Sequence, residues 1–324
     1  MTWLLFIAGC LGEPEPACPP GMVLVHGLGT VGLDPGAYAL VETRGREVVD
    51  APELECPAAR EAQPESIACW VQTDEVDPVL MPREVAVADF CIEPYPFPGD
   101  GSRWTDDGMT AWDAQALERL LASGRYGTRR LCTMTEFQLA VAGPSGNRPF
   151  VYGETQDPAR CPVDGAIGAD PECLNAETGV HDYGAVRSHW VRADAAFIAR
   201  ACDSPPCRGA GNRPLTEGHY VVAGGTARVQ TRQAPLTPHT WHDHGVPNPE
   251  GCDAMGHDDQ VAICAEPAPA YGGLLGLDDD AKAGEEGWAA LVALARETAS
   301  MTQTLEAGLG EAVCPASPGA PPAP

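Results

Sequence analysis

Three histidines that lie close together are the residues of this chain with the types best suited to chemistry. His239, His242 and His244 fall within six residues, and Asp243 or Asp258 could add a carboxylate. Neutral imidazoles suit zinc, copper and iron(II), so this segment could hold a transition metal. However, the i, i+3, i+5 spacing matches no recurrent ligand pattern, and we favour the alternative of a solvated polar loop.

The cysteines form the second set of reactive side chains. The chain has 13 of them and no Cys-x-x-Cys pair, which argues against structural zinc and favours disulfides formed in an oxidising compartment. Cys202 and Cys207 flank a short Asp-Ser-Pro-Pro turn and predict a local disulfide. Cys161 and Cys173 are predicted to form a disulfide within the loop-rich segment 143–178. Cys91 and Cys132 are further disulfide candidates, and the sequence alone does not assign the remaining connectivity.

The first ten residues resemble an export signal. They are short and apolar and end in Ile7-Ala-Gly-Cys10, which is similar to the lipobox of bacterial lipoproteins. This pattern predicts lipidation at Cys10, followed by a Pro-rich tether over 11–17, in a protein of the bacterial cell envelope or periplasm. The segment lacks a positively charged start and its apolar run is short, so the alternatives are a trimmed or ordinary secretory signal and a chance tetrapeptide.

The charge of the chain excludes one class of partner. The formal net charge is −26, and Lys282 is the single lysine. Nucleic-acid binding needs clustered basic residues to displace counterions from phosphates, so we exclude it. No later segment has the apolar length of a membrane span, which leaves a lipid at Cys10 as the expected membrane contact.

Local patterns predict the elements that must position these residues. A capping box, Thr133-x-x-Glu136, predicts a helix that begins at Thr133. High glycine and proline contents, 36 and 32 residues, predict a loop-rich fold with short elements. The other predicted elements are helices over 111–123 and 285–305, strands over 22–25, 84–92, 220–222, 228–230 and 261–263, irregular segments over 43–83 and 143–178, and an unpacked tail over 315–324.

Aromatic residues near the predicted turns have two interpretations. Tyr95, Phe97, Trp104 and Trp112 could line a groove, but core packing is the commoner use of such side chains, and we favour it. The 285–305 helix is expected to pack on the domain, with partner binding as the alternative.

Seven short segments resemble, in order, motifs of a single family. They are Cys18-Pro-Pro-Gly-Met-Val-Leu-Val25, Ala88-Asp-Phe-Cys-Ile-Glu93, Arg130-Leu-Cys-Thr-Met-Thr-Glu-Phe137, Arg148-Pro-Phe-Val-Tyr-Gly153, Gly179-Val-His-Asp182, Tyr220-Val-Val-Ala-Gly-Gly-Thr226 and Ile263-Cys-Ala265. The family is the formylglycine-generating enzymes or sulfatase-modifying factors, and the third segment resembles its Arg-Leu-x-Thr-x-x-Glu-Trp hallmark. The resemblance implies a compact α+β, C-type-lectin-like domain over 18–268. Apolar spacing and composition predict that 269–324 holds a C-terminal amphipathic helix and a disordered Pro/Ala tail.

The chain departs from the family at two sites. Catalytic members bind copper(I) with two cysteines four residues apart, whereas the corresponding segment here, 233–260, contains only Cys252. The calcium-binding motif also fails, because Val186 and His189 stand where the family has Asn and Glu, and only Trp190 remains.

These departures favour a non-catalytic binding or structural module, a pseudoenzyme, with a protein or carbohydrate ligand at the cell envelope. The alternative is a divergent oxidoreductase that uses iron or copper, with His239, His242 and His244 as the metal ligands. Ordinary formylglycine formation ranks last because the thiol pair is missing.

Overall fold

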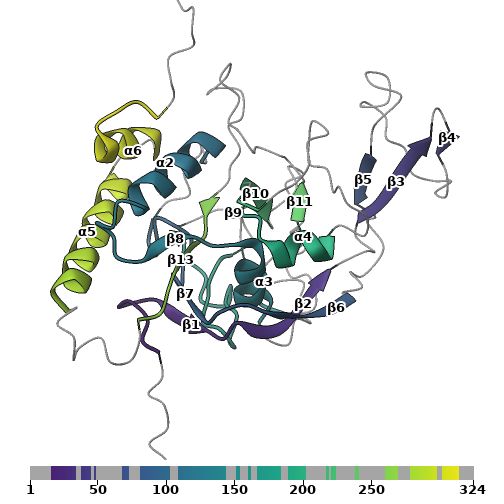
Figure 1. Cartoon of the computed structure of the whole chain (residues 1–324), viewed down its shortest axis with the longest axis horizontal. Helices are drawn as coiled ribbons and strands as arrows, with labels where there is room; N and C mark the ends of the chain where they lie inside the picture. Colours follow the sequence, from purple (N-terminus) through teal and green to yellow (C-terminus); the bar gives the residue numbers. More distant parts are fainter. Residues whose placement is uncertain are drawn as a thin grey trace, which may run out of the picture.

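The computed structural model of the chain shows a mixed α+β fold with short strands in antiparallel sheets (Figure 1). It describes residues 16–33, 38–44, 47–48, 68–72, 81–102, 109–143, 151–153, 160–161, 166–183, 189–201, 217–218, 220–223, 238–240, 260–268, 278–297 and 301–313. None of the helices in these ranges is long and apolar enough to cross a membrane.

A four-stranded antiparallel sheet occupies the centre of the domain. Its order is β1 (Val23–Val25), β7 (Phe90–Ile92), β13 (Ile263–Ala265) and β8 (Arg129–Leu131). Leu131 and Ile263 are register partners, and both contribute to a hydrophobic cluster under the C-terminal helices. The next residues, Cys132 and Cys264, belong to a second cluster, because successive side chains of a strand point to opposite faces.

The described residues form three further sheets. The second sheet also has four strands, in the order β11 (Pro238–Thr240), β10 (Tyr220–Ala223), β9 (His189–Arg192) and β12 (Gln260–Val261), with β12 parallel to β9. A two-stranded antiparallel sheet consists of β2 (Leu28–Leu33) and β6 (Met81–Ala86). The last sheet contains β4 (Glu47–Val48), β3 (Tyr38–Arg44) and β5 (Ala68–Gln72).

Several strand predictions need correction. The strand expected over 84–92 is two strands, β6 and β7, because the chain bends between them at residues 87–89. In this bend the Asp89 carboxylate accepts from the backbone N–H of Gly27 at 2.9 Å. The segment 43–83, expected to be irregular, contains parts of β3 and β6 and all of β4 and β5. The expected strand at 261–263 is divided between β12 and β13, and 228–230 lies outside the described residues.

Hydrogen bonds of three side chains account for the residue types at the centre of the segment 130–137, which resembles the family hallmark. Helix α3 (Met134–Ala142) begins after Thr133, and the predicted capping box is confirmed: Thr133 Oγ1 accepts from the N–H of Glu136, and the Glu136 carboxylate accepts from the N–H of Thr133. Arg130 also donates to both oxygens of Glu136, at 2.8 and 2.6 Å. A short helix, α4 (Ala195–Ala201), packs beside α3. The Arg, Thr and Glu of this segment therefore hold a strand and a helix together.

Three helices cover one side of the central sheet (Figure 1). They are α2 (Ala111–Leu121), α5 (Asp278–Glu297) and α6 (Met301–Leu309). The predicted 111–123 helix is thus confirmed apart from its end, whereas the single helix expected over 285–305 is two helices. Apolar side chains of all three helices share one buried cluster with the sheet, so the C-terminal region packs on the domain as expected.

Helix α5 approaches the backbone of the 125–127 turn closely. A Cβ atom added at Gly284 would lie 2.8 Å from the backbone N of Gly127, and one at Gly287 would lie 2.5 Å from the backbone O of Arg125. Only glycine fits at these two helical positions, which allows the helix to lie directly on the turn.

A buried ion network fixes the same helix to the sheet. Arg129 of β8 is fully buried and donates to both carboxylate oxygens of Glu285 on α5, at 2.7 and 2.9 Å. Its Nε donates to Glu93, which follows β7, at 3.0 Å. We call these three residues the Arg129 clamp. Two carboxylates share one guanidinium, so the clamp carries an excess negative charge.

Three disulfides lie within the described residues, and two of them join segments that are distant in sequence. Cys161 and Cys173 are bonded across the loop-rich segment, Cys91 is bonded to Cys18, and Cys132 is bonded to Cys264. The last two bonds span 73 and 132 residues. Each stabilises the fold by about 4–5 kcal/mol in the chain-entropy treatment, because long loops of the unfolded chain lose the most freedom.

Breaking the clamp should destabilise the protein strongly. Arg129→Met leaves Glu93 and Glu285 facing each other with no cation between them, and we expect a loss of about 3–5 kcal/mol in the free energy of unfolding. Urea denaturation at neutral pH measures it. The matched control is Arg119→Met, which removes an exposed pair with Glu311 and should cost about 1 kcal/mol or less. Equal losses for the two variants would contradict the role given to the clamp.

Candidate functional site

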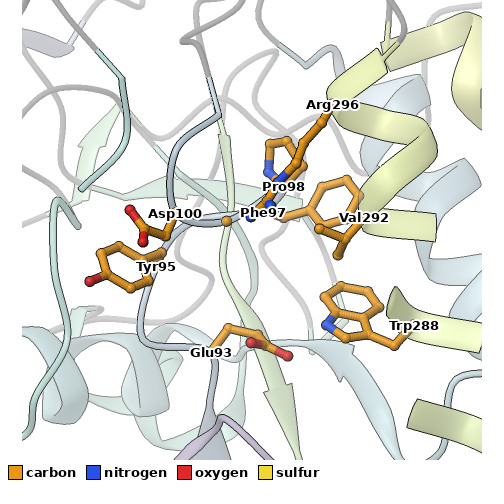
Figure 2. Close-up of a pocket in the computed structure, with 9 residues that line it drawn as sticks. Glu93, Tyr95, Phe97, Pro98, Asp100, Trp288, Val292 and Arg296 are labelled. Carbon is orange, nitrogen blue, oxygen red and sulfur yellow. The ribbon is translucent and has the colours of Figure 1, made fainter. Parts of the chain in front are cut away.

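A pocket lies between the turn that follows β7 and the C-terminal helix α5 (Figure 2). We call it the turn pocket. Its volume is about 140 Å³. The residues that line it are Glu93, Tyr95, Phe97, Pro98, Gly99, Asp100, Trp288, Val292 and Arg296. Its two walls therefore come from segments nearly 200 residues apart in the sequence.

Three aromatic side chains line the pocket: Tyr95, Phe97 and Trp288. Phe97 and Trp288 are almost fully buried, and their ring centroids lie 5.4 Å apart at an interplanar angle of 41°. Tyr95 stands on the opposite wall, away from α5 (Figure 2). Trp288 also lies under the Arg129 guanidinium, whose central carbon is 4.9 Å from the ring centroid. The pocket therefore combines apolar ring faces with the charges of the clamp.

Charged groups lie at two depths in the pocket. Glu93, a member of the clamp, lies inside and directs its carboxylate toward the indole of Trp288 (Figure 2). Burial raises the pKa of Glu93, although hydrogen bonding and the positive charge of Arg129 oppose the shift. Asp100 and Arg296 are exposed, and Arg296 donates to Ser102 Oγ at 3.1 Å.

A second group of polar residues adjoins the pocket behind Tyr95. The His181 ring stacks on Tyr95 with centroids 4.7 Å apart, and burial lowers the pKa of His181. Asp182 has a φ of 62°, and its carboxylate accepts from the N–H of Gly168. Burial raises the pKa of Asp182 to about 6; the negative charges of Asp170 and Asp100 add to the shift and the hydrogen bond from Gly168 opposes it. A carboxyl group with this pKa can exchange a proton near neutral pH.

The side chains of most site residues predicted from sequence lie outside the part of the chain that the structure describes. His239 is part of β11, but its side chain is not described, and His242, His244, Cys202, Cys207 and Cys10 lie outside the described ranges. Within the part of the chain that the structure describes, no group of three or more His, Cys, Asp or Glu side chains could hold a metal ion.

The segment that resembles a degraded calcium motif enters the core. His189 in β9 is fully buried, with its ring 5.5 Å from Phe137 and 5.1 Å from Tyr183, centroid to centroid. Trp190 is buried as expected, and its Nε1–H donates to the backbone O of Met109 at 2.8 Å. Among the described residues, His189 thus packs against two aromatic rings of the core.

Sequence reasoning found only part of the turn pocket. It named Tyr95 and Phe97 as possible groove residues, favoured core packing for them, and grouped them with Trp104 and Trp112. Trp112 packs against the cluster under the helices, and Trp104 lies outside the described residues. Trp288 and Arg296 were missed as site residues. They are eight positions apart on one helix, and no local pattern relates them to the turn at 93–100.

A scan against models of known protein families finds no match for this chain, and a search of curated proteins finds no significant relative.

The pH dependence of stability should reveal the buried carboxyl of Asp182. Its folded pKa of about 6 exceeds the unfolded value of 3.8, so its contribution is complete below about pH 4 and is lost as the pH rises through 6. Asp182→Asn keeps an acceptor for Gly168 and tolerates a positive φ. We expect this variant to be more stable than the wild type by about 1–3 kcal/mol above pH 7.

Thermal unfolding from acidic to mildly alkaline pH tests this expectation. The control is Glu286→Gln, which removes one charge from an exposed site on α5 and should change the free energy of unfolding by about 0.5 kcal/mol or less. An Asp182→Asn variant that is less stable than the wild type at pH 7.5 would show that the carboxylate stabilises the fold in its charged form.

Proposed function

We propose that this protein is an exported binding module of the cell envelope, built on a sulfatase-modifying-factor-like framework that no longer forms formylglycine. The turn pocket is its ligand site. A shared framework does not require a shared activity, because function resides in sites and not in folds.

The pairing of the cysteines carries this proposal. All six cysteines whose side chains the structure describes are joined in disulfides. Copper(I) requires free thiolates, and none is present in this described set. The sequence between 233 and 260, where the family has its thiol pair, supplies Cys252 alone.

The arrangement of the motif segments supports the framework. Four segments that resemble the family, at 18–25, 88–93, 130–137 and 263–265, meet in the central sheet and its disulfides. In the hallmark segment, Arg130 and the backbone N–H of Thr133 both donate to the Glu136 carboxylate. These contacts give the hallmark residues a structural role. A non-catalytic binding module can keep that role.

Export and lipid attachment at Cys10 complete the proposal. The disulfides are compatible with an oxidising compartment, which in bacteria lies outside the cytoplasm. The Ile7-Ala-Gly-Cys10 segment would place the lipid on a short tether ahead of β1. Such an anchor holds the pocket near the membrane surface without a spanning helix.

Oxygen uptake distinguishes the binding module from an oxidase. We expect the purified full chain, supplied with copper(I) and a cysteine-containing sulfatase peptide, to consume oxygen at the rate of the peptide and copper alone. Mass spectrometry of the peptide should show unmodified cysteine. Uptake above this background, with conversion of the cysteine to formylglycine, would overturn the proposed loss of activity.

Lipid labelling tests the anchor. In a bacterial host grown with labelled palmitate, the wild-type chain should carry label and Cys10→Ala should carry none, because the acyl chains depend on that residue. Cys56→Ala is the control, since it removes a different cysteine and should keep the label. Equal labelling of wild type and Cys10→Ala would exclude the anchor.

A further inference from the structure

We propose that the turn pocket binds a small organic cation, namely an ammonium or guanidinium group carried on a short alkyl chain. The inference rests on the proposed function, because it takes this pocket as the ligand site of a binding module. Three features of the pocket lead to it: the ring faces, the balance of charges and the size.

The ring faces suit a positive charge. A cation over an aromatic face gains about 0.5–2 kcal/mol, and tryptophan is the best partner. Trp288 already accepts one cation in this protein, the Arg129 guanidinium. Phe97 and Tyr95 also line the pocket, so a ligand cation there would lie close to aromatic rings of both walls.

The charges around the pocket leave a negative excess inside. Glu93 shares Arg129 with Glu285, so the clamp has two carboxylates for one guanidinium. Burial raises the pKa of Glu93, and the negative charge of Glu285 adds to the shift. Asp100 adds a further carboxylate at the mouth, where Arg296 is the one basic residue of the lining. A ligand cation beside Glu93 would neutralise the clamp.

The size of the pocket limits the ligand. Pockets for drug-sized ligands measure about 300–1,000 Å³, whereas this one holds about 140 Å³. It can therefore enclose a group of the size of a lysine or arginine side chain. Pro98 and Val292 line it beside the rings and offer apolar contact for an alkyl chain. The net charge of −26 attracts cations to the protein from a distance.

A titration with matched small molecules tests the charge requirement. Butylguanidinium and butylammonium are compared with butylurea, a neutral isostere of butylguanidinium. The full chain is labelled with nitrogen-15 in its tryptophans, and the indole N–H signal of Trp288, assigned with Trp288→Phe, reports binding. We expect both cations to bind with a Kd of about 1 mM or tighter and butylurea to bind at least about tenfold more weakly.

Four variants test the location and sign of the charges. Glu93→Gln keeps an acceptor for Arg129 and leaves the clamp neutral, so the protein should stay folded while cation binding weakens about tenfold or more. Asp100→Asn, at the exposed mouth, should weaken binding about two- to fivefold. Arg296→Gln removes a repelling charge and should strengthen binding about two- to fivefold. The control Glu286→Gln should change the Kd less than twofold.

Three results would overturn the inference. The first is no binding of either cation at a ligand concentration of about 10 mM, roughly tenfold above the expected Kd. The others are butylurea binding as tightly as butylguanidinium, and weaker cation binding in Arg296→Gln. If Glu93→Gln loses its cooperative unfolding transition, Asp100→Asn alone decides the role of the carboxylates. A failed titration would reject the cation ligand without rejecting the proposed loss of formylglycine formation, because oxygen uptake is measured without these ligands.

Discussion

The burial of one guanidinium, that of Arg129, is the constraint on which the rest of this structure depends. A fully buried cation requires carboxylates, and Arg129 obtains them from the end of β7 and from helix α5. This pairing fixes the C-terminal helix against the central sheet, where two glycines let it lie directly on the 125–127 turn. The turn pocket exists because these two segments are held at this separation.

Two adjacent arginines in one strand stabilise opposite sides of the sheet. Successive residues of β8 point to opposite faces, so Arg129 meets α5 while Arg130 meets Glu136 at the start of α3. Arg130 and Glu136 are matched one to one. On the side of Arg129 the carboxylates outnumber the guanidinium, and this imbalance lies next to the aromatic rings of the pocket.

The sequence predicted those features that depend on neighbouring residues. Helix α3 follows from its local cap and helix α2 from its apolar spacing. The cysteine usage indicated disulfides, and three are present among the described residues. The break between β6 and β7 was missed, because it depends on a contact between Asp89 and Gly27 across 62 residues. The pocket was missed for a similar reason: it depends on tertiary docking of α5, and the apolar spacing of that helix indicates a buried face without indicating what it faces.

Because its walls are encoded so far apart, the turn pocket cannot form on a nascent chain. The turn at 93–100 emerges from the ribosome first, but Trp288 and Arg296 follow nearly 200 residues later. A chain that crosses a membrane from its N-terminus would therefore gain the capacity to bind only at the end of translocation. Ligand recognition would then occur only in the compartment where the last helix folds.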